Sequence, residues 1–256
     1  MERRSILILG HGSRRPRANA EFEVLVEHFR ARAPEREVGH AYIELAEPLL
    51  ADGLVAAARA AERVTVLPLF LFAAGHVKDD VPAALAEARR RFPAARFEAS
   101  PALGVDPALV AMALERAGAA VPLRGDEAAR TVLLAVGRGS SDPEANGDFC
   151  KLVRLLGEGG GFARAEPCFI AITGPGFEEA AARVALSRPE RVLVLPYFLF
   201  EGLLVEELRE KVARFAADHR AIDVRLAAHL GPDDRLLDVL EARLAAVDPA
   251  EEARAA

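Results

Sequence analysis

The 256-residue sequence contains no tryptophan, only two cysteines, and no excess of positive charge. Cys150 and Cys168 cannot form a disulfide framework and lack metal-ligand spacing, so we expect a reducing, cytoplasmic compartment. The net charge of -6 gives no general attraction to nucleic acid or anionic membranes, and neither is expected as a partner. The N-terminal apolar run is too short for a secretory signal, and no run could span a bilayer. An anionic ligand would therefore have to meet a local basic cluster.

Short apolar runs alternate with longer stretches of helical period, and 52% hydrophobic content suffices for a buried core. The expected strands of the first half are 5–10, 38–44, 63–71 and 95–100, and the expected helices are 18–33, 48–60, 77–91 and 106–118. The second half repeats the order, with expected strands at 131–137, 165–172, 191–200 and 222–228. This alternation predicts an α/β fold with doubly wound, four-stranded parallel sheets and helices on both faces.

The two halves also match residue by residue. "HGSRRPRAN" from His11 matches "RGSSDPEAN" from Arg138, and "YIELAEP" matches "FIAITGP", both at an offset of 127 residues. "VTVLPLFLF" matches "VLVLPYFLF" at an offset of 128. Three landmarks in the same order indicate an internal duplication. The predicted division is an N-terminal domain of residues 1–120 that carries the site, a degenerate C-terminal repeat of residues 129–248, and a tail of residues 249–256.

The differences between the two copies point to the functional residues. His11 is matched by Arg138, Glu44 by Ala171 and His76 by Leu204, so these three potential metal ligands or proton carriers occur only in the first copy. The turn-forming glycine, serine, proline and asparagine are kept in both copies. This pattern predicts one working half and one supporting half.

The three residues should lie at one edge of a sheet. If the strands of each half are ordered 2-1-3-4, the carboxyl ends of the first three strands are neighbours, and each of the three residues follows one of them. Two imidazoles and a carboxylate suit Co²⁺, Fe²⁺ or Ni²⁺, and three protein ligands leave a coordination position open. Structural alternatives exist for each: His11 could cap a helix, His76 could face Asp79 and Asp80, and Glu44 could pair with any basic group.

Arginines follow the first of these strands directly. Arg14, Arg15 and Arg17 stand where a helix begins, a place that favours acidic residues, and Lys78 lies two residues after His76. They could be an ordinary solvated helix start. A ligand bearing carboxylates explains them better, because guanidinium groups bind carboxylates in a bidentate geometry.

"GHGSRRPRAN", "YIELAEPLL" and "VLPLFLFAAGHVKDD" together resemble the sirohydrochlorin chelatases, the type II tetrapyrrole chelatases, in their two-unit long form. The resemblance implies a lyase that inserts Co²⁺ into sirohydrochlorin, a tetrapyrrole with eight carboxylates, in cobalamin biosynthesis. It implies that His11 and His76 bind the metal and assist proton removal, and that Glu44 completes the metal site. The alternatives are a sirohydrochlorin ferrochelatase of sirohaem synthesis and a non-catalytic carrier of metal or tetrapyrrole.

The resemblance also sets expectations for the substrate and the assembly. The substrate-binding residues would be Ser13, Arg14, Arg15, Arg17, Phe72, Lys78 and Arg138. Among these, Phe72 would touch the macrocycle, and Arg138 would meet a carboxylate from the opposite wall of a cleft. No tightly bound cofactor is expected, since Co²⁺, Fe²⁺ or Ni²⁺ would be the substrate metal. Two repeated domains in one chain favour a monomer.

Overall fold

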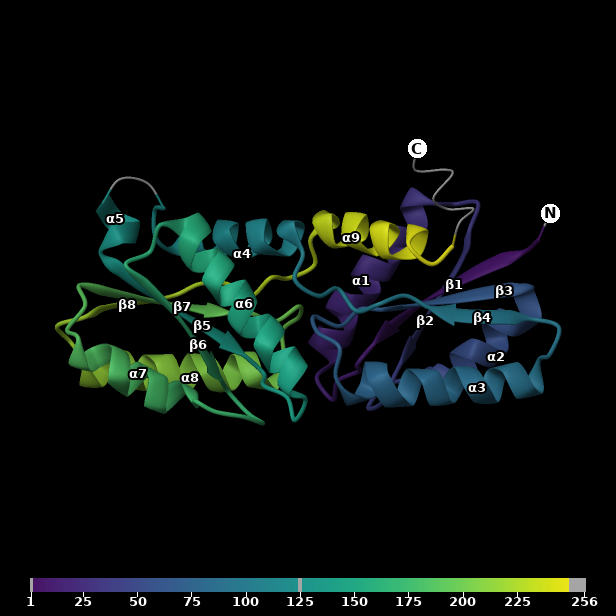
Figure 1. Ribbon diagram of the computed structural model, residues 1–256, viewed down its shortest axis with the longest axis horizontal. Helices are drawn as coiled ribbons and strands as arrows, with labels where there is room; N and C mark the ends of the chain where they lie inside the picture. Colours follow the sequence, from purple (N-terminus) through teal and green to yellow (C-terminus); the bar gives the residue numbers. More distant parts are fainter. Residues whose placement is uncertain (1, 124–125, 249–256) are drawn as a thin grey trace. The chain divides into compact units, whose positions relative to one another are not determined.

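The computed structural model describes residues 2–123 and 126–248. The chain divides into two compact units, whose described parts are residues 2–104 with 232–248 (unit 1) and residues 105–123 with 126–231 (unit 2). Each unit is an α/β layered structure built on its own four-stranded sheet (Figure 1).

The elements of unit 1 are β1 (Arg4–Gly10), α1 (Pro16–Arg32), β2 (Glu37–Tyr42), α2 (Leu50–Ala60), β3 (Arg63–Pro68), the π-helix η1 (His76–Asp80), α3 (Val81–Arg91), β4 (Arg96–Ala99) and α9 (Asp234–Ala245). Those of unit 2 are α4 (Pro107–Ala120), α5 (Asp126–Ala129), β5 (Thr131–Gly137), α6 (Pro143–Gly160), β6 (Arg164–Phe169), α7 (Phe177–Leu186), β7 (Arg191–Pro196), α8 (Leu203–Asp218) and β8 (Asp223–Leu226).

Both sheets have the strand order that the sequence predicts. The order is β2-β1-β3-β4 in unit 1 and β6-β5-β7-β8 in unit 2, and the strand pairs are parallel. All seven residues of β5 are buried, as is typical of a central parallel strand that is covered by helices on both faces. The predicted fold class is therefore confirmed.

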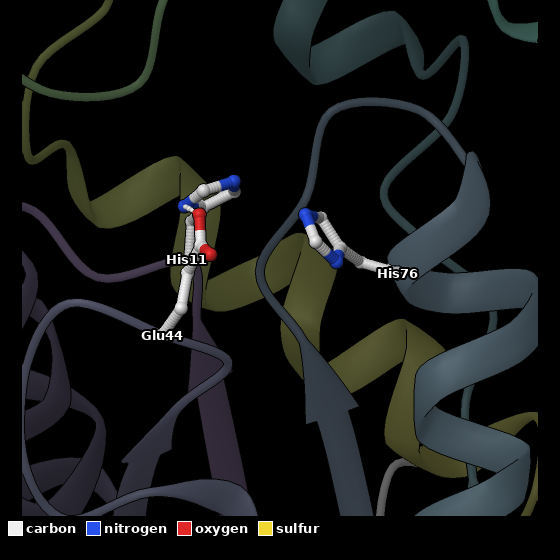
Figure 2. A group of neighbouring side chains, drawn as sticks. All are labelled: His11, Glu44 and His76. Carbon is white, nitrogen blue, oxygen red and sulfur yellow. Dashed lines mark ion pairs between the residues drawn. The ribbon is translucent and has the colours of Figure 1, made fainter. Parts of the chain in front are cut away.

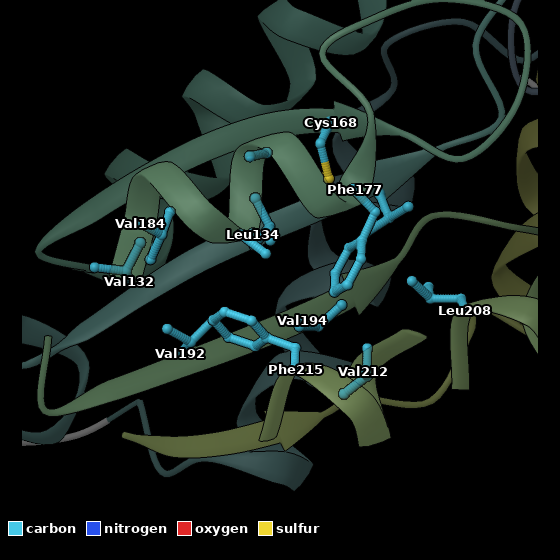
Figure 3. Packing of buried hydrophobic residues seen from close by; sticks show 13 residues of the cluster. Val132, Leu134, Cys168, Phe177, Val184, Val192, Val194, Leu208, Val212 and Phe215 are labelled. Carbon is cyan, nitrogen blue, oxygen red and sulfur yellow. The ribbon is translucent and has the colours of Figure 1, made fainter. Parts of the chain in front are cut away.

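Figure 3 shows the core on one face of the unit 2 sheet. The side chains of β5 and β7 that point to this face pack against the apolar stripes of α7 and α8. The rings of Phe177 and Phe215 meet nearly edge to face, with centroids 6.4 Å apart. In unit 1, α2 and α3 cover the corresponding face of the sheet.

The last helix of each sequence half packs in the unit built mainly from the other half. Helix α9 contacts α1 and β3 of unit 1, whereas α4 contacts α6 and β7 of unit 2 (Figure 1). The reason is the apolar face of α4, where Leu109, Met112 and Ala113 are fully buried. The predicted halves, 1–120 and 129–248, follow the sequence repeat, while the units follow packing. The predicted tail, 249–256, lies outside the described residues.

Two local features differ from the expected elements. Helix α5 lies within residues 118–130, which carry no apolar periodicity. Strand β3 ends at Pro68 and not at residue 71, because the backbone of Phe70 turns away to accept a hydrogen bond from Leu103 N (2.9 Å). None of the helices in the described part of the chain is long and apolar enough to cross a membrane.

We expect the fragment 105–231 to unfold in one cooperative transition. We expect the fragment 129–248 to be less stable and to unfold with lower cooperativity. The second fragment lacks α4, whose Leu109 and Met112 each contribute about 1.5–3 kcal/mol by burial. Urea denaturation of both fragments, followed by circular dichroism, measures the difference. An equally stable and cooperative 129–248 fragment would show that the sequence halves, and not the packed units, are the folding units.

Candidate metal centre

The three residues found only in the first copy follow three neighbouring strands of unit 1. His11 comes directly after β1, Glu44 lies two residues after β2, and His76 begins η1 beyond β3. The strand order β2-β1-β3 makes these strand ends adjacent. Glu44 N donates a hydrogen bond to His11 O (3.1 Å), which joins the first two loops directly. Figure 2 shows the His76 ring facing His11 and Glu44 across a gap.

The ligand atoms of these side chains are close enough to share one ion. One nitrogen or oxygen from each residue lies within 4.8 Å of the other two. The rings of His11 and His76 meet edge to face, with centroids 4.9 Å apart. Metal–ligand bonds of about 2.1 Å place two ligands up to about 4.2 Å apart, so a small side-chain rotation closes the site.

Partial exposure makes the site reachable. The side chains of His11, Glu44 and His76 are 28%, 48% and 35% exposed. An ion can therefore enter from solvent and leave toward a second molecule, which a fully enclosed structural metal site would prevent. Across residues 2–123 and 126–248, no other group of three His, Cys, Asp or Glu side chains brings its ligand atoms this close together.

Hydrogen bonds select one nitrogen of each imidazole. His11 Nδ1–H donates to Gly12 O (3.2 Å), and His76 Nδ1–H donates to Asp80 Oδ2 (2.6 Å), because a carbonyl and a carboxylate can only accept. With the ring proton on Nδ1, the Nε2 atom of each ring can donate its lone pair to a metal ion. Asp80 is not among the site residues predicted from sequence, although it lies four residues after His76 on a helix, a spacing at which side chains meet.

Glycine is required between His11 and Ser13. Gly12 has φ +88°, and a Cβ atom on it would lie 1.8 Å from Glu44 O. Gly139 holds the same place in the second copy, with φ +85° and a Cβ position 3.0 Å from Thr173 N. The glycine therefore permits the loop after β1 to approach the loop after β2, which brings His11 to Glu44.

Ser13 stabilises the turn that follows. Its Oγ accepts a hydrogen bond from Arg15 N (3.0 Å), and its carbonyl accepts one from the Asn19 side chain (2.9 Å). Ser140 and Asn146 repeat this arrangement in the second copy, at 3.0 and 2.8 Å. A structural role thus accounts for the serine in both copies, and its contact with substrate stays a prediction.

The predicted basic residues lie on loops and helix starts at the same sheet edge. Arg14 and Arg15 are exposed between β1 and α1, and Lys78 is exposed on η1. Arg17 is also exposed, with its Nε 3.5 Å from Glu21 Oε1. Two further predicted residues are Phe72, half-buried in the loop after β3, and Arg138, exposed after β5 of unit 2. The backbone oxygen of Arg138 accepts from Ala171 N (3.1 Å), just as that of His11 accepts from Glu44 N.

The corresponding edge of unit 2 holds an ion pair. Glu201, only 6% exposed, accepts two hydrogen bonds from Arg209 at 2.7 and 2.8 Å. This contact raises the pKa of the Arg209 guanidinium. His229 Nδ1 lies 3.9 Å from Glu201 Oε2. The second copy thus places a paired cation at this edge where the first copy has its three ligand side chains.

Comparisons with known proteins agree with the duplicated fold. The family model described as CbiX matches residues 5–120 and again residues 132–247. The chain is 32% identical over 242 residues to a sirohydrochlorin cobaltochelatase of Priestia megaterium, covering 94% of this chain and 78% of the relative. It is 31% identical over 233 residues to a sirohydrochlorin ferrochelatase of Bacillus subtilis, covering 90% and 86%. The structure of SirB from Bacillus subtilis with Fe³⁺ matches with a TM-score of 0.81 and 26% identity, covering 94% of both chains.

We expect His11→Ala and His76→Ala each to weaken Co²⁺ binding by more than about 100-fold, because loss of a direct ligand should exceed the 10–100-fold cost of losing an outer partner. Titration of the Co²⁺ visible absorption band, without tetrapyrrole, measures the affinity. His28→Ala is the matched control, since His28 is an exposed histidine on α1 that pairs with Asp234 (3.2 Å). Retained affinity in both site variants would place the ion elsewhere.

Proposed function

The chain belongs to the CbiX family, and from this premise we propose that it is a sirohydrochlorin chelatase that inserts Co²⁺ into sirohydrochlorin. The observation that carries the proposal is the meeting of His11, Glu44 and His76 within 4.8 Å at an open sheet edge. All three are absent from the second copy, although its backbone turn is the same. Because both copies fold with the same turn, folding does not require His11, Glu44 and His76. Their presence in the first copy therefore supports a function for them.

The ligand types suit an ion that must be bound and then released. Neutral imidazole and carboxylate bind first-row divalent ions with moderate affinity, and three protein ligands leave positions open for the incoming pyrrole nitrogens. A thiolate would hold the ion more firmly. Cys168 is buried in unit 2, where burial raises the pKa of its thiol, so it stays protonated and away from this chemistry.

Metal insertion must remove two N–H protons from the tetrapyrrole as a doubly charged ion enters. Each metal–Nε2 bond that breaks leaves a basic imidazole nitrogen at the place where a pyrrole nitrogen arrives. His11 and His76 can then accept the two protons, since the unprotonated nitrogen of a neutral imidazole is a base. The charge of the site is balanced, because two protons enter as one divalent ion leaves. Glu44 keeps the site attractive to cations throughout.

The basic residues at the same edge provide for the carboxylates of the substrate. Arg14, Arg15, Arg17 and Lys78 place four positive side chains there in a protein of net charge -6. Exposed guanidinium groups bind carboxylates with good geometry and hold a rigid macrocycle in register. Phe72 supplies an apolar surface beside them. Ser13 and Arg138 are also proposed to contact the substrate.

We propose Co²⁺ as the substrate metal because the chain is 32% identical over 242 residues to a relative named as a cobaltochelatase. Fe²⁺ is the alternative, and it is supported by the relative named as a ferrochelatase. Ni²⁺ suits the same ligands. A second candidate function is a carrier that binds metal or tetrapyrrole and passes it on without accelerating insertion.

An anaerobic assay separates these possibilities. We expect the protein to accelerate the spectral conversion of sirohydrochlorin with Co²⁺ most strongly, with Fe²⁺ next, and to release two protons per turnover into a weakly buffered solution. A faster reaction with Fe²⁺ would reassign the metal. Metal binding with no acceleration by any of Co²⁺, Fe²⁺ and Ni²⁺ would favour the carrier over the enzyme.

Replacing Arg14, Arg15 and Arg17 together by alanine should raise the KM for sirohydrochlorin by about tenfold or more, with a smaller change in kcat, because these residues bind the substrate and not the reacting nitrogens. The control is Arg90→Ala, an exposed arginine of α3 that pairs with Glu87. Steady-state kinetics at saturating Co²⁺ measures both constants. An unchanged KM would contradict the assigned role of the cluster.

A further inference from the structure

We propose that Asp80 is a positioning residue: its carboxylate holds the proton of His76 on Nδ1, so that Nε2 is free to bind the substrate metal. The inference rests on the proposed function, which makes His76 a metal ligand. It adds a residue that acts through His76, together with the local backbone feature that brings the two side chains together.

The contact itself has the geometry of a strong, charge-assisted hydrogen bond. His76 Nδ1 and Asp80 Oδ2 are 2.6 Å apart, and the carboxylate can only accept. A neutral imidazole carries one ring proton, and the partner of one nitrogen decides which nitrogen keeps it. With the proton held on Nδ1, the Nε2 lone pair points away from Asp80. Histidines that bind metals commonly have such an outer carboxylate, and its loss weakens metal binding.

Two structural explanations for Asp80 do not account for its position. It is the N-cap residue of α3, yet its side chain makes no capping hydrogen bond to that helix. Its side chain is 57% exposed, so it has no core packing to maintain. Its carboxylate instead accepts a hydrogen bond from the ring of His76. The contact is therefore directed at the site and not at the stability of the helix.

A single additional residue creates the turn that carries this pair. Lys78 N donates to Ala74 O, and Glu206 N donates to Gly202 O, so the two copies correspond at an offset of 128 up to this point. From Val81 onward the offset is 127, because buried Val81 corresponds to buried Leu208. The first copy therefore has one more residue between Lys78 and Val81.

The additional residue changes the helix type. In the first copy His76–Asp80 is a π-helix, closed by a hydrogen bond from Val81 N to His76 O, whereas α8 of the second copy runs from Leu203 without such a turn. Short π-helical turns occur frequently at functional sites. Where the first copy has both Asp79 and Asp80, the second has one acidic residue, Glu207, and that carboxylate pairs with Lys211 (3.4 Å). The insertion, the histidine and its carboxylate partner thus occur together.

The test uses three variants of the full-length protein. Asp80→Ala removes the acceptor, and Asp80→Asn keeps an oxygen that can accept from Nδ1–H. Asp79→Ala is the matched control, since it removes one acidic charge from the same exposed turn. Long-range ¹H–¹⁵N NMR spectra, recorded without metal and well above the ordinary imidazole pKa of about 6.5, report which ring nitrogen of His76 is protonated.

We expect the Nδ1–H tautomer of His76 in the wild type, in Asp79→Ala and in Asp80→Asn, and a mixture with the Nε2–H tautomer in Asp80→Ala. Titration with Co²⁺ alone should show affinity about 10–100-fold weaker in Asp80→Ala, little changed in Asp79→Ala, and within a few-fold of wild type in Asp80→Asn. If the Asp80 carboxylate contributed only its negative charge, Asp80→Asn would lose as much Co²⁺ affinity as Asp80→Ala.

An unchanged His76 tautomer and an unchanged Co²⁺ affinity in Asp80→Ala would overturn the inference. So would equal losses in Asp79→Ala and Asp80→Ala, which would mean that general charge and not the hydrogen bond matters. The proposed function is tested separately: a wild type that binds Co²⁺ with the expected variant pattern, yet does not accelerate insertion into sirohydrochlorin, would refute the activity and leave the role of Asp80 in place.

Discussion

The candidate site depends on the close approach of two loops at the carboxyl ends of β1 and β2. Gly12 makes this approach possible, because any side chain there would collide with the backbone oxygen of Glu44. The hydrogen bond from Glu44 N to His11 O then fixes the two loops against each other. Once they are joined, the third ligand has to come from the neighbouring strand on the other side of β1, and η1 supplies His76 there. Backbone packing thus brings the ligand positions together.

The duplication separates what folding requires from what the chemistry requires. Both copies keep the glycine of positive φ, the serine and asparagine of the turn, and the backbone bond between the first two loops. The side chains that project from this shared backbone differ: the first copy presents His11 and Glu44, and the second presents Arg138 and Ala171. At its own edge the second unit pairs the buried carboxylate of Glu201 with the exposed side chain of Arg209. The same backbone can therefore carry metal-ligand side chains at this edge of the sheet, as in the first copy, or an ion pair, as in the second.

Much of the fold could be predicted from sequence, because apolar runs of strand length, helical periodicity and the repeat all require parallel sheets. The meeting of His11, Glu44 and His76 was also predictable, since the strand order places three successive strand ends together. The packing of α4 in unit 2 and of α9 in unit 1 could not be predicted from sequence. A sequence repeat identifies residues that are similar, but it does not say which unit each helix packs on. Asp80 was missed for a related reason: one inserted residue shifts the alignment of the copies from 128 to 127 within the turn that carries it.

In the proposed reaction, the metal passes to the tetrapyrrole from the three ligands of the first copy. Single-turnover mixing tests it most directly: protein loaded with one equivalent of Co²⁺, with no free metal, is mixed anaerobically with sirohydrochlorin. We predict that the absorption band of protein-bound Co²⁺ disappears at the rate at which the cobalt tetrapyrrole forms, faster than with the same amount of Co²⁺ in buffer. Product formation that is no faster than in buffer, or that leaves the protein-bound band intact, would contradict the claim.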